Sequence, residues 1–304
     1  MNIPASRILI TGATGLLGRP ILKVCAAQCA WQVIGTSFRR TGENLERIDL
    51  SQVAAIPAFL DRLDPNIIIH TAAERHPDVS EKDPDGTQRL NVGATAAIAQ
   101  WAAAHHAFLI YISTDYVFDG TKAPYRTGDR PHPINAYGQS KLEGEQAVQK
   151  ACDNYAILRV PILYGKVETL DESPITVLAK TMLTARPGTP LTMENWATRY
   201  PTHTGDVAAV LRQMVAYKLT HPEFRGLFHW SGNEPMTKYG IALAFAPLIG
   251  FDAQRLVPDA TPPHGAPRPK DAHLDTSELE RLGMGQLTPF TAAIPSIIAP
   301  HLPQ

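Results

Sequence analysis

The 304-residue chain has little of what marks a secreted, membrane-bound or nucleic-acid-binding protein. It holds three cysteines, and its formal net charge is −1. So few thiols indicate a reducing compartment, and a near-neutral chain gives no electrostatic reason to bind nucleic acid or an anionic membrane. No apolar run reaches the roughly 18 residues that span a bilayer, and the first residues lack the charged and apolar segments of a signal peptide. We therefore expect a cytoplasmic protein with no membrane and no nucleic-acid partner.

Metal-ligand patterns and internal repeats are also missing. Cys25 and Cys29 lie four residues apart on a predicted first helix, without histidine or further cysteine at ligand spacing. We interpret both as small core residues, and we expect no metal site. No repeat, low-complexity tract or disordered linker is evident, and 44% hydrophobic with 19% charged residues is typical of a globular protein.

A glycine-spaced turn stands near the start of the chain. An apolar strand pattern at 8–10 leads into Gly12, Gly15 and Gly18, and an apolar helical pattern follows. Such a turn lets the backbone approach a pyrophosphate, whose charge is met by N–H groups and by the positive end of the helix. A purely structural turn is the alternative, but the strand–turn–helix context favours a dinucleotide site. The other turn residues assigned to it are Thr14, Leu16 and Leu17.

The end of the second predicted strand, at 31–37, indicates which dinucleotide binds. An NAD site usually has an acidic side chain there, whereas this chain has Phe38, Arg39 and Arg40. Two guanidinium groups can hold a 2′-phosphate by forked hydrogen bonds, so NADP(H) is favoured over NAD(H). A solvated pair of surface charges is the alternative. Further cofactor contacts are expected from Asp49 at the adenine edge, from Ala72 and Ala73 after a buried strand, and from Asn91.

Strand and helix patterns alternate at least five times before residue 165, which predicts an α/β fold with a doubly wound parallel sheet. Beyond that point prolines become frequent and the alternation turns irregular, with a short strand at 226–232 and helices at 237–249 and 276–282. We expect a cofactor-binding domain at 1–165 and a smaller, mainly substrate-binding domain at 166–304. Segments around 202–232 are expected to return to the first domain. The second domain would close a cleft over the carboxyl edge of the sheet.

A tyrosine–lysine pair carries the predicted chemistry. Tyr137 and Lys141 are four residues apart, so on a helix they share one face. A free phenol has a pKa of about 10, and a nearby ammonium would lower that pKa toward the working range. Lys141 could also donate to the nicotinamide ribose, and Thr114 ends a predicted strand where it could donate to the same substrate oxygen. Most such pairs are ordinary surface contacts, but with the upstream turn we predict Thr114, Tyr137 and Lys141 to be catalytic.

The motifs at 11–18, 113–118 and 137–141 resemble the extended short-chain dehydrogenase/reductase superfamily, a Rossmann fold. Within it, 113–120 and 135–145 are similar to the dTDP-4-dehydrorhamnose reductase family. A closer similarity, to the family of regulatory beta subunits of methionine adenosyltransferase, covers nearly the whole chain. The segments that carry this similarity are 73–79, 199–203, 228–234, 236–239 and Arg268-Pro269.

The resemblance implies NADP(H) binding and assigns the catalytic trio and the cofactor turn to the residues above. It also implies a substrate site that contains Glu74, Arg75, Arg199 and Arg268, the last near sugar-nucleotide phosphates in relatives. The chain departs from the rhamnose-pathway reductases at Glu74-Arg75-His76, which leaves the sugar open; we interpret His76 as a loop residue, because nothing beside it would orient the ring.

Two functions follow from the resemblance. One is NADPH-dependent reduction of a nucleotide-activated 4-keto-6-deoxy sugar. The other is a non-catalytic, NADP-binding regulatory subunit that binds the methionine adenosyltransferase catalytic subunit in S-adenosylmethionine synthesis. Fold analogy does not decide between them. The sequence also leaves the oligomeric state open, with a homodimer as one option.

Overall fold

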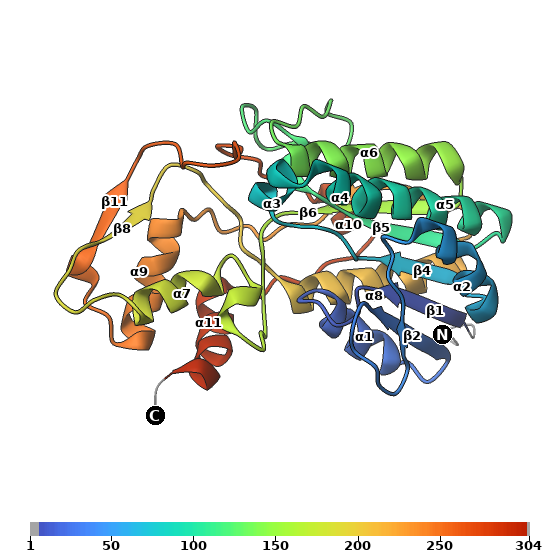
Figure 1. The fold of residues 1–304 in the computed structure, drawn as a ribbon, viewed down its shortest axis with the longest axis horizontal. Coiled ribbons are helices and arrows are strands. Elements are labelled where there is room, and N and C mark those ends of the chain that lie inside the picture. The colour runs from blue at the N-terminus through green and yellow to red at the C-terminus, as the bar shows by residue number, and fades with distance from the viewer. Residues whose placement is uncertain (1–5, 303–304) are drawn as a thin grey trace.

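The computed structural model describes residues 6–302, and it divides into a larger and a smaller half (Figure 1). The larger half is built on a seven-stranded sheet in the order β3-β2-β1-β4-β5-β6-β10, with every neighbouring pair parallel. This confirms the predicted doubly wound α/β fold. Its strands are β1 (Ser6–Thr11), β2 (Trp31–Ser37), β3 (Leu45–Arg47), β4 (Ile67–His70), β5 (Phe108–Thr114), β6 (Tyr155–Val160) and β10 (Gly226–His229).

Helices cover both faces of this sheet, because its strands are apolar on both sides. In β1, Ile8 and Ile10 belong to one buried cluster and Leu9 to the other. The first cluster lies under α1 (Gly18–Ala26) and α8 (Thr204–Thr220), which contact each other. The second lies under α2 (Ile56–Leu63), α5 (Ala94–Ala104) and α6 (Ala136–Ala151), and the short helices α3 (Pro77–Lys82) and α4 (Pro84–Gln88) follow β4.

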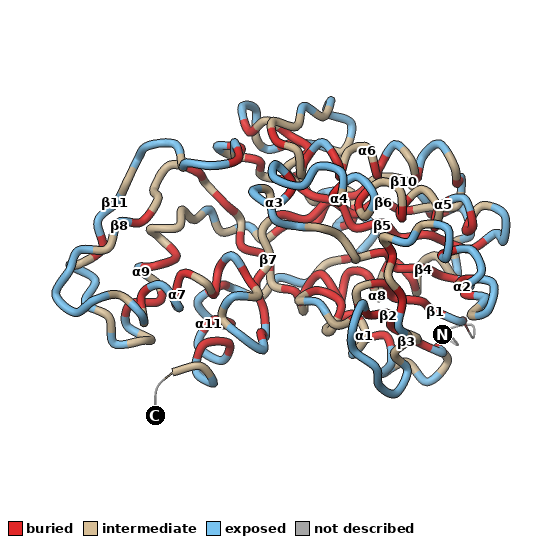
Figure 2. The backbone as a smooth tube through the Cα atoms, in the orientation of Figure 1, coloured by how far each residue is buried: buried red, intermediate tan, exposed pale blue. Residues whose placement is uncertain are grey.

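The smaller half has its own apolar core, visible as buried stretches on the left of Figure 2. Two short parallel pairs, β7 with β9 and β8 with β11, belong to the segments after residue 160. Its elements are β7 (Leu163–Tyr164), α7 (Thr176–Leu183), β8 (Leu191–Glu194), β9 (Thr202–His203), α9 (Lys238–Ile249), β11 (Leu256–Asp259) and α11 (Phe290–Ile298). The helix predicted at 237–249 is confirmed by α9. No helix within residues 6–302 is long and apolar enough to cross a bilayer.

The chain passes between the halves more than once. Strand β10 and helix α8 belong to the larger half, as their pairing with β6 and contact with α1 require. Helix α10 (Ser277–Arg281) also returns there, because Leu279 and Met284 join the cluster of Trp230 under the sheet. The helix predicted at 276–282 is therefore present. The domain boundary at residue 165 stays a prediction, and the outer limits of the two predicted domains lie outside the described residues.

The two neighbouring cysteines lie in different environments. Helix α1 ends at Ala26, so Cys25 is buried on the helix whereas Cys29 is exposed beyond its end. The prediction that both are core residues is right for Cys25 and wrong for Cys29. The spacing of four residues does not place the pair on one helix face, because the helix stops between them.

His70 of β4 gives the protein an acid-sensitive core. Its Nδ1 lies 2.7 Å from the hydroxyl oxygen of Thr11, and its Nε2 lies 3.0 Å from that of Thr95. Burial, with a smaller effect of the Lys141 charge, lowers the pKa of His70 to about 3. The unfolded chain has a histidine pKa of about 6.5, so below that pH it takes up a proton that the folded state does not accept. The contribution of neutral His70 to the free energy of unfolding is therefore fully present above about pH 6.5 and is lost as the pH falls toward 3.

We expect His70 to remove about 2 kcal/mol of unfolding free energy between pH 7 and pH 5. Chemical denaturation at the two pH values, for the wild type and for His70→Gln, measures this loss. The variant should lose less stability on acidification by about that amount, whatever its stability at pH 7. An identical loss in both proteins would show that His70 is not the source.

Candidate active site

The glycine turn joins β1 to α1 at the carboxyl edge of the sheet, where the strand order reverses between β1 and β4. Gly12 has a φ of +66°, in the left-handed region. A Cβ on Gly18 would lie 2.2 Å from the carbonyl oxygen of Gly12 and 2.6 Å from the Cα of Ala13. No side chain caps the N-terminus of α1, and its first turn has no acidic residue. The turn therefore has the close packing and the positive helix end that an adenine dinucleotide requires.

The close approach of Gly18 to the backbone of Gly12 and Ala13 leads to a prediction about stability. Gly18→Ala should lower the free energy of unfolding by about 1–3 kcal/mol, because the added methyl group overlaps backbone atoms that cannot move cheaply. Gly128→Ala is the matched control, since nothing lies within 4 Å of a Cβ there. Denaturant unfolding compares the two variants, and equal midpoints would contradict the packing role of Gly18.

The end of β2 presents an aromatic ring beside two guanidinium groups. Phe38 is 55% exposed, and the Arg39 guanidinium lies 5.3 Å from its ring centroid. Arg40 is exposed and donates two hydrogen bonds to Glu168, of 2.8 Å and 2.6 Å. An exposed ring with adjoining guanidinium groups suits an adenine ring that carries a 2′-phosphate. Asp49 accepts hydrogen bonds from the N–H and hydroxyl of Ser51, at 2.9 Å and 2.7 Å, and so holds its own turn.

Asn91 fixes the chain that follows β4. Its Oδ1 accepts from the N–H of Glu74 at 2.8 Å, and its Nδ2 donates to the Glu74 carbonyl at 2.9 Å and to the Ser140 hydroxyl at 3.0 Å. These bonds tie the segment of Ala72 and Ala73 to α6. Contact between Asn91 and a cofactor stays a prediction, but the structure gives its amide a positioning role.

Glu74 and Arg75 stand at the rim of the site. The Oε1 of Glu74 accepts from the N–H of His76 and lies 2.8 Å from its Nδ1, so a carboxylate does orient this ring, contrary to our expectation. Asn91 ties Glu74 to Ser140 of the helix that carries Tyr137, and the charges of Arg75 and Tyr137 act on each other. The structure thus brings the loop after β4 to the predicted catalytic residues.

The structure brings Thr114 and Tyr137 together. Thr114 ends β5, and Tyr137 lies in the first turn of α6, whose N-cap Asn135 accepts a 2.7 Å hydrogen bond from Gly138. Burial raises the pKa of Tyr137 above its usual range, and a hydrogen bond with Thr114 acts in the opposite direction. At neutral pH the phenol is therefore protonated and can act as a proton donor.

Lys141 is not among the main influences on the pKa of Tyr137, which differs from our expectation. Its Nζ lies 4.0 Å from the ring centroid of Tyr111. Burial lowers the pKa of Lys141 to about 7, against an opposing effect of the Glu145 carboxylate. Arg75 is the cation that favours the Tyr137 phenolate. Residue spacing places the pair on one helix face, but only the fold determines how deeply the ammonium is buried.

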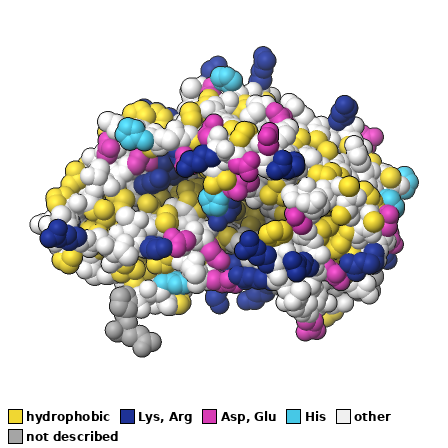
Figure 3. Space-filling view, in the orientation of Figure 1, with side chains coloured by type: hydrophobic (Ala, Val, Ile, Leu, Met, Phe, Trp, Pro, Cys, Tyr) yellow, Lys and Arg dark blue, Asp and Glu magenta, His cyan; other side chains and the backbone are white. Residues whose placement is uncertain are grey.

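Two arginines from the later part of the chain act on these groups. Arg199 lies 2.5 Å from a Glu194 carboxylate oxygen, and Arg268 lies 2.7 Å from an oxygen of Asp78. Both act on the pKa of Tyr116, whose ring centroid is 5.9 Å from that of Tyr137. Both arginines therefore lie near Tyr116. Figure 3 shows a hollow between the two halves with basic and acidic side chains gathered around it.

Sequence reasoning missed two residues of this site. Lys238 begins α9, and its pKa is lowered by burial and then by the charge of Arg199, so it stands beside the two arginines. Its place in the 236–239 motif could have indicated it. Asp115 follows Thr114, and burial raises the pKa of its carboxyl to about 7. The sequence predicts a role for Thr114 from its place at the end of a strand, but no pattern in the sequence shows that Asp115 is buried.

Comparisons with known proteins cover nearly the whole chain. A family model described as "RmlD substrate binding domain" matches residues 6–302. Methionine adenosyltransferase 2 subunit beta of Mus musculus is 46% identical over 303 residues, which cover 99% of this chain and 90% of the relative.

Two solved structures are similar over almost the full length. A dTDP-4-dehydrorhamnose reductase of Clostridium acetobutylicum superposes with a TM-score of 0.83 at 29% identity, covering 97% of this chain and 99% of that one. A dTDP-4-dehydrorhamnose reductase of Bacillus anthracis, in complex with NADP, has a TM-score of 0.83 at 24% identity and covers 99% and 100%. The latter likeness bears on the fold alone.

Proposed function

The chain belongs to the RmlD substrate-binding-domain family, and on this premise we propose that it is an NADPH-dependent reductase of a nucleotide-activated 4-keto-6-deoxy sugar. The observation that carries the proposal is the meeting of Thr114 and a protonated Tyr137 at the carboxyl edge of the sheet, near an uncapped glycine turn. The family and the reductase structures agree with this assignment.

NADP(H) would lie across the glycine turn, with its adenosine end against Phe38, Arg39 and Arg40. When bound, NADPH supplies the hydride that adds to the ketone carbon. The Thr114 hydroxyl, which donates to the Asp115 carboxylate at 2.9 Å, would rotate to donate to the ketone oxygen. Tyr137 would transfer its phenolic proton to that oxygen as negative charge develops. Solvent then returns a proton to Tyr137. Arg75 favours the phenolate that remains, and Lys141 in its ammonium form would donate to the cofactor ribose.

The substrate diphosphate would meet the cations of the smaller half. Arg199, Arg268 and Lys238 come from three separate segments; the charges of the two arginines act on Tyr116, and both arginines act on Lys238. Guanidinium groups bind phosphate oxygens through paired hydrogen bonds, and Lys238 adds an ammonium group at the start of α9. Glu194 and Asp78 hold the two guanidinium groups in place. The sugar itself would then extend toward Thr114.

Turnover tests this proposal directly. Purified protein is mixed with NADPH and a panel of nucleotide-activated 4-keto-6-deoxy sugars, dTDP-linked first, and NADPH absorbance is followed. Loss of absorbance that depends on the sugar is the expected result. If NADPH binds but no sugar of the panel is reduced, the reductase assignment fails.

A second function is favoured by the 46% identity to a methionine adenosyltransferase subunit over 99% of this chain. On this alternative the protein binds a methionine adenosyltransferase catalytic subunit and carries NADP(H) as a structural ligand. Size-exclusion chromatography of the mixture, with the methionine affinity of the synthetase as a second readout, tests it. No complex at micromolar concentrations would count against the alternative.

A further inference from the structure

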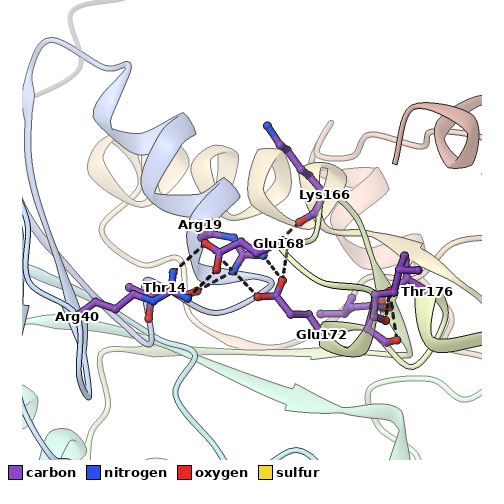
Figure 4. Close-up of polar contacts among 10 residues, drawn as sticks. Thr14, Arg19, Arg40, Lys166, Glu168, Glu172 and Thr176 are labelled. Carbon is purple, nitrogen blue, oxygen red and sulfur yellow. Dashed lines mark hydrogen bonds and ion pairs between the residues drawn. The ribbon is translucent and has the colours of Figure 1, made fainter. Parts of the chain in front are cut away.

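A segment of the smaller half crosses over the cofactor turn. After β7, residues 166–172 bring Glu168 and Glu172 to two arginines of the larger half (Figure 4). We call Arg19, Arg40, Glu168 and Glu172 the clasp. It links the two halves directly at the mouth of the proposed NADP(H) site.

Three ion pairs hold the clasp together, and the longest joins Arg19 to Glu168 at 3.9 Å. Arg40 donates to both carboxylate oxygens of Glu168, at 2.8 Å and 2.6 Å. Arg19 lies 2.6 Å from Glu172 and also donates to the Thr14 carbonyl of the glycine turn at 2.8 Å. The N–H of Glu168 donates to Glu172 at 3.0 Å. Glu168 is therefore held against Arg40 by its own segment.

The carboxylate of Glu168 accepts from the same Arg40 donors that a 2′-phosphate would need. A two-pronged Arg–carboxylate pair uses the same guanidinium donors as a two-pronged Arg–phosphate pair. Arg40 cannot direct both Nη groups at Glu168 and at a 2′-phosphate together. Arg39 is different: within residues 6–302 it forms no ion pair and lies over Phe38.

We propose that Glu168 is a cofactor-specificity residue that competes with the 2′-phosphate of NADP(H) for Arg40. This inference rests on the NADP(H) site of the proposed function and adds how that site discriminates. NADP(H) binding displaces Glu168 from Arg40, whereas NAD(H), which lacks the phosphate, leaves the pair intact. Glu168 thus reduces the preference that Arg39 and Arg40 create. It also couples phosphate binding to the segment that enters the smaller half.

Ligand fragments isolate the effect of the phosphate. Isothermal titration calorimetry measures the affinities of 2′,5′-ADP, 5′-AMP, NADP⁺ and NAD⁺ for the wild type and for Glu168→Gln. The variant should bind 2′,5′-ADP and NADP⁺ roughly three- to fivefold more tightly, the range set by an exposed ion pair. Its affinities for 5′-AMP and NAD⁺ should not change.

Asp171→Asn is the matched control. Asp171 lies in the same segment and the change removes the same charge, but its carboxylate is paired with Lys180 at 2.5 Å. Its phosphate affinity should equal that of the wild type. In an Arg40→Met background, Glu168→Gln should give no gain, because the competition requires Arg40.

Three results would overturn the inference. They are equal 2′,5′-ADP affinities for wild type and Glu168→Gln, an equal gain for 5′-AMP, or a gain that persists in Arg40→Met. If none of the proteins binds NADP⁺ or NAD⁺, the proposed function fails and the inference fails with it. Tight NADP⁺ binding with equal affinities overturns the inference alone.

Discussion

Tyr137→Phe is expected to lower kcat for keto-sugar reduction by about 10²- to 10⁴-fold, the range for loss of a general acid. The change removes the hydroxyl and keeps the ring, so the edge-on contact with Tyr116 at 5.9 Å persists. Thr114 can still polarise the ketone, but no group then delivers a proton to its oxygen. The measurement is the rate of NADPH oxidation under saturating sugar.

Tyr155→Phe is the matched control, because Tyr155 begins β6 and lies away from the catalytic groups. It should keep the wild-type rate, and both variants should keep the NADPH affinity. A Tyr137→Phe protein with unchanged kcat would remove the phenol from the mechanism. The same variant separates the two functions, since a regulatory subunit would bind the synthetase equally well without the hydroxyl.

Arg159→Met should lower the free energy of unfolding by about 3–5 kcal/mol, because it leaves a carboxylate buried without its cation. Arg159 of β6 donates to Glu145 of α6 at 2.8 Å and 2.6 Å, and both side chains are 2% exposed. Ser113 donates to the same carboxylate at 2.5 Å. The pair joins the sheet to the helix that carries Tyr137, so its loss should also disturb the active site.

The double variant Arg159→Met/Glu145→Gln distinguishes two causes of instability, the unpaired buried carboxylate of Glu145 and the lost contacts of the Arg159 side chain. It should be more stable than Arg159→Met alone, because the buried carboxylate is gone. Urea unfolding of the wild type, the single variants and the double variant closes the cycle. A double variant less stable than Arg159→Met would show that the charge is not the cause.

Local patterns in the sequence predicted most of the sheet. The strand at 31–37 matches β2, and the glycine turn lies where the strand–helix pattern placed it. Helices α3 and α4 were missed, because their polar residues and prolines resemble a loop. Yet proline at the first positions of a helix is favourable, since no partner is needed there for its missing N–H. Helix α8 was missed because it is buried around much of its circumference and so lacks a clear polar stripe.

The sequence predicts those features of the candidate site that follow from the spacing of residues on one helix. It does not predict those that follow from burial or from contacts between distant segments. The i, i+4 pair of Tyr137 and Lys141 follows from helix geometry, but the low pKa of Lys141 follows from burial. Glu168 and Arg40 are 128 residues apart, and no local pattern links them. Asn91 illustrates the same limit, because its hydrogen bonds to Glu74 and Ser140 arise only when three segments meet.

The return of residues near Leu279 and Met284 to the cluster of Trp230 has a consequence for engineering. A fragment that stopped at 165 would lack an edge strand of its sheet, a covering helix and these late side chains. The apolar face of its sheet would be exposed to water and would favour aggregation. A chimera that takes its smaller half from a relative therefore needs more than one junction in the chain. A working chimera would have to be matched at every crossing of the chain.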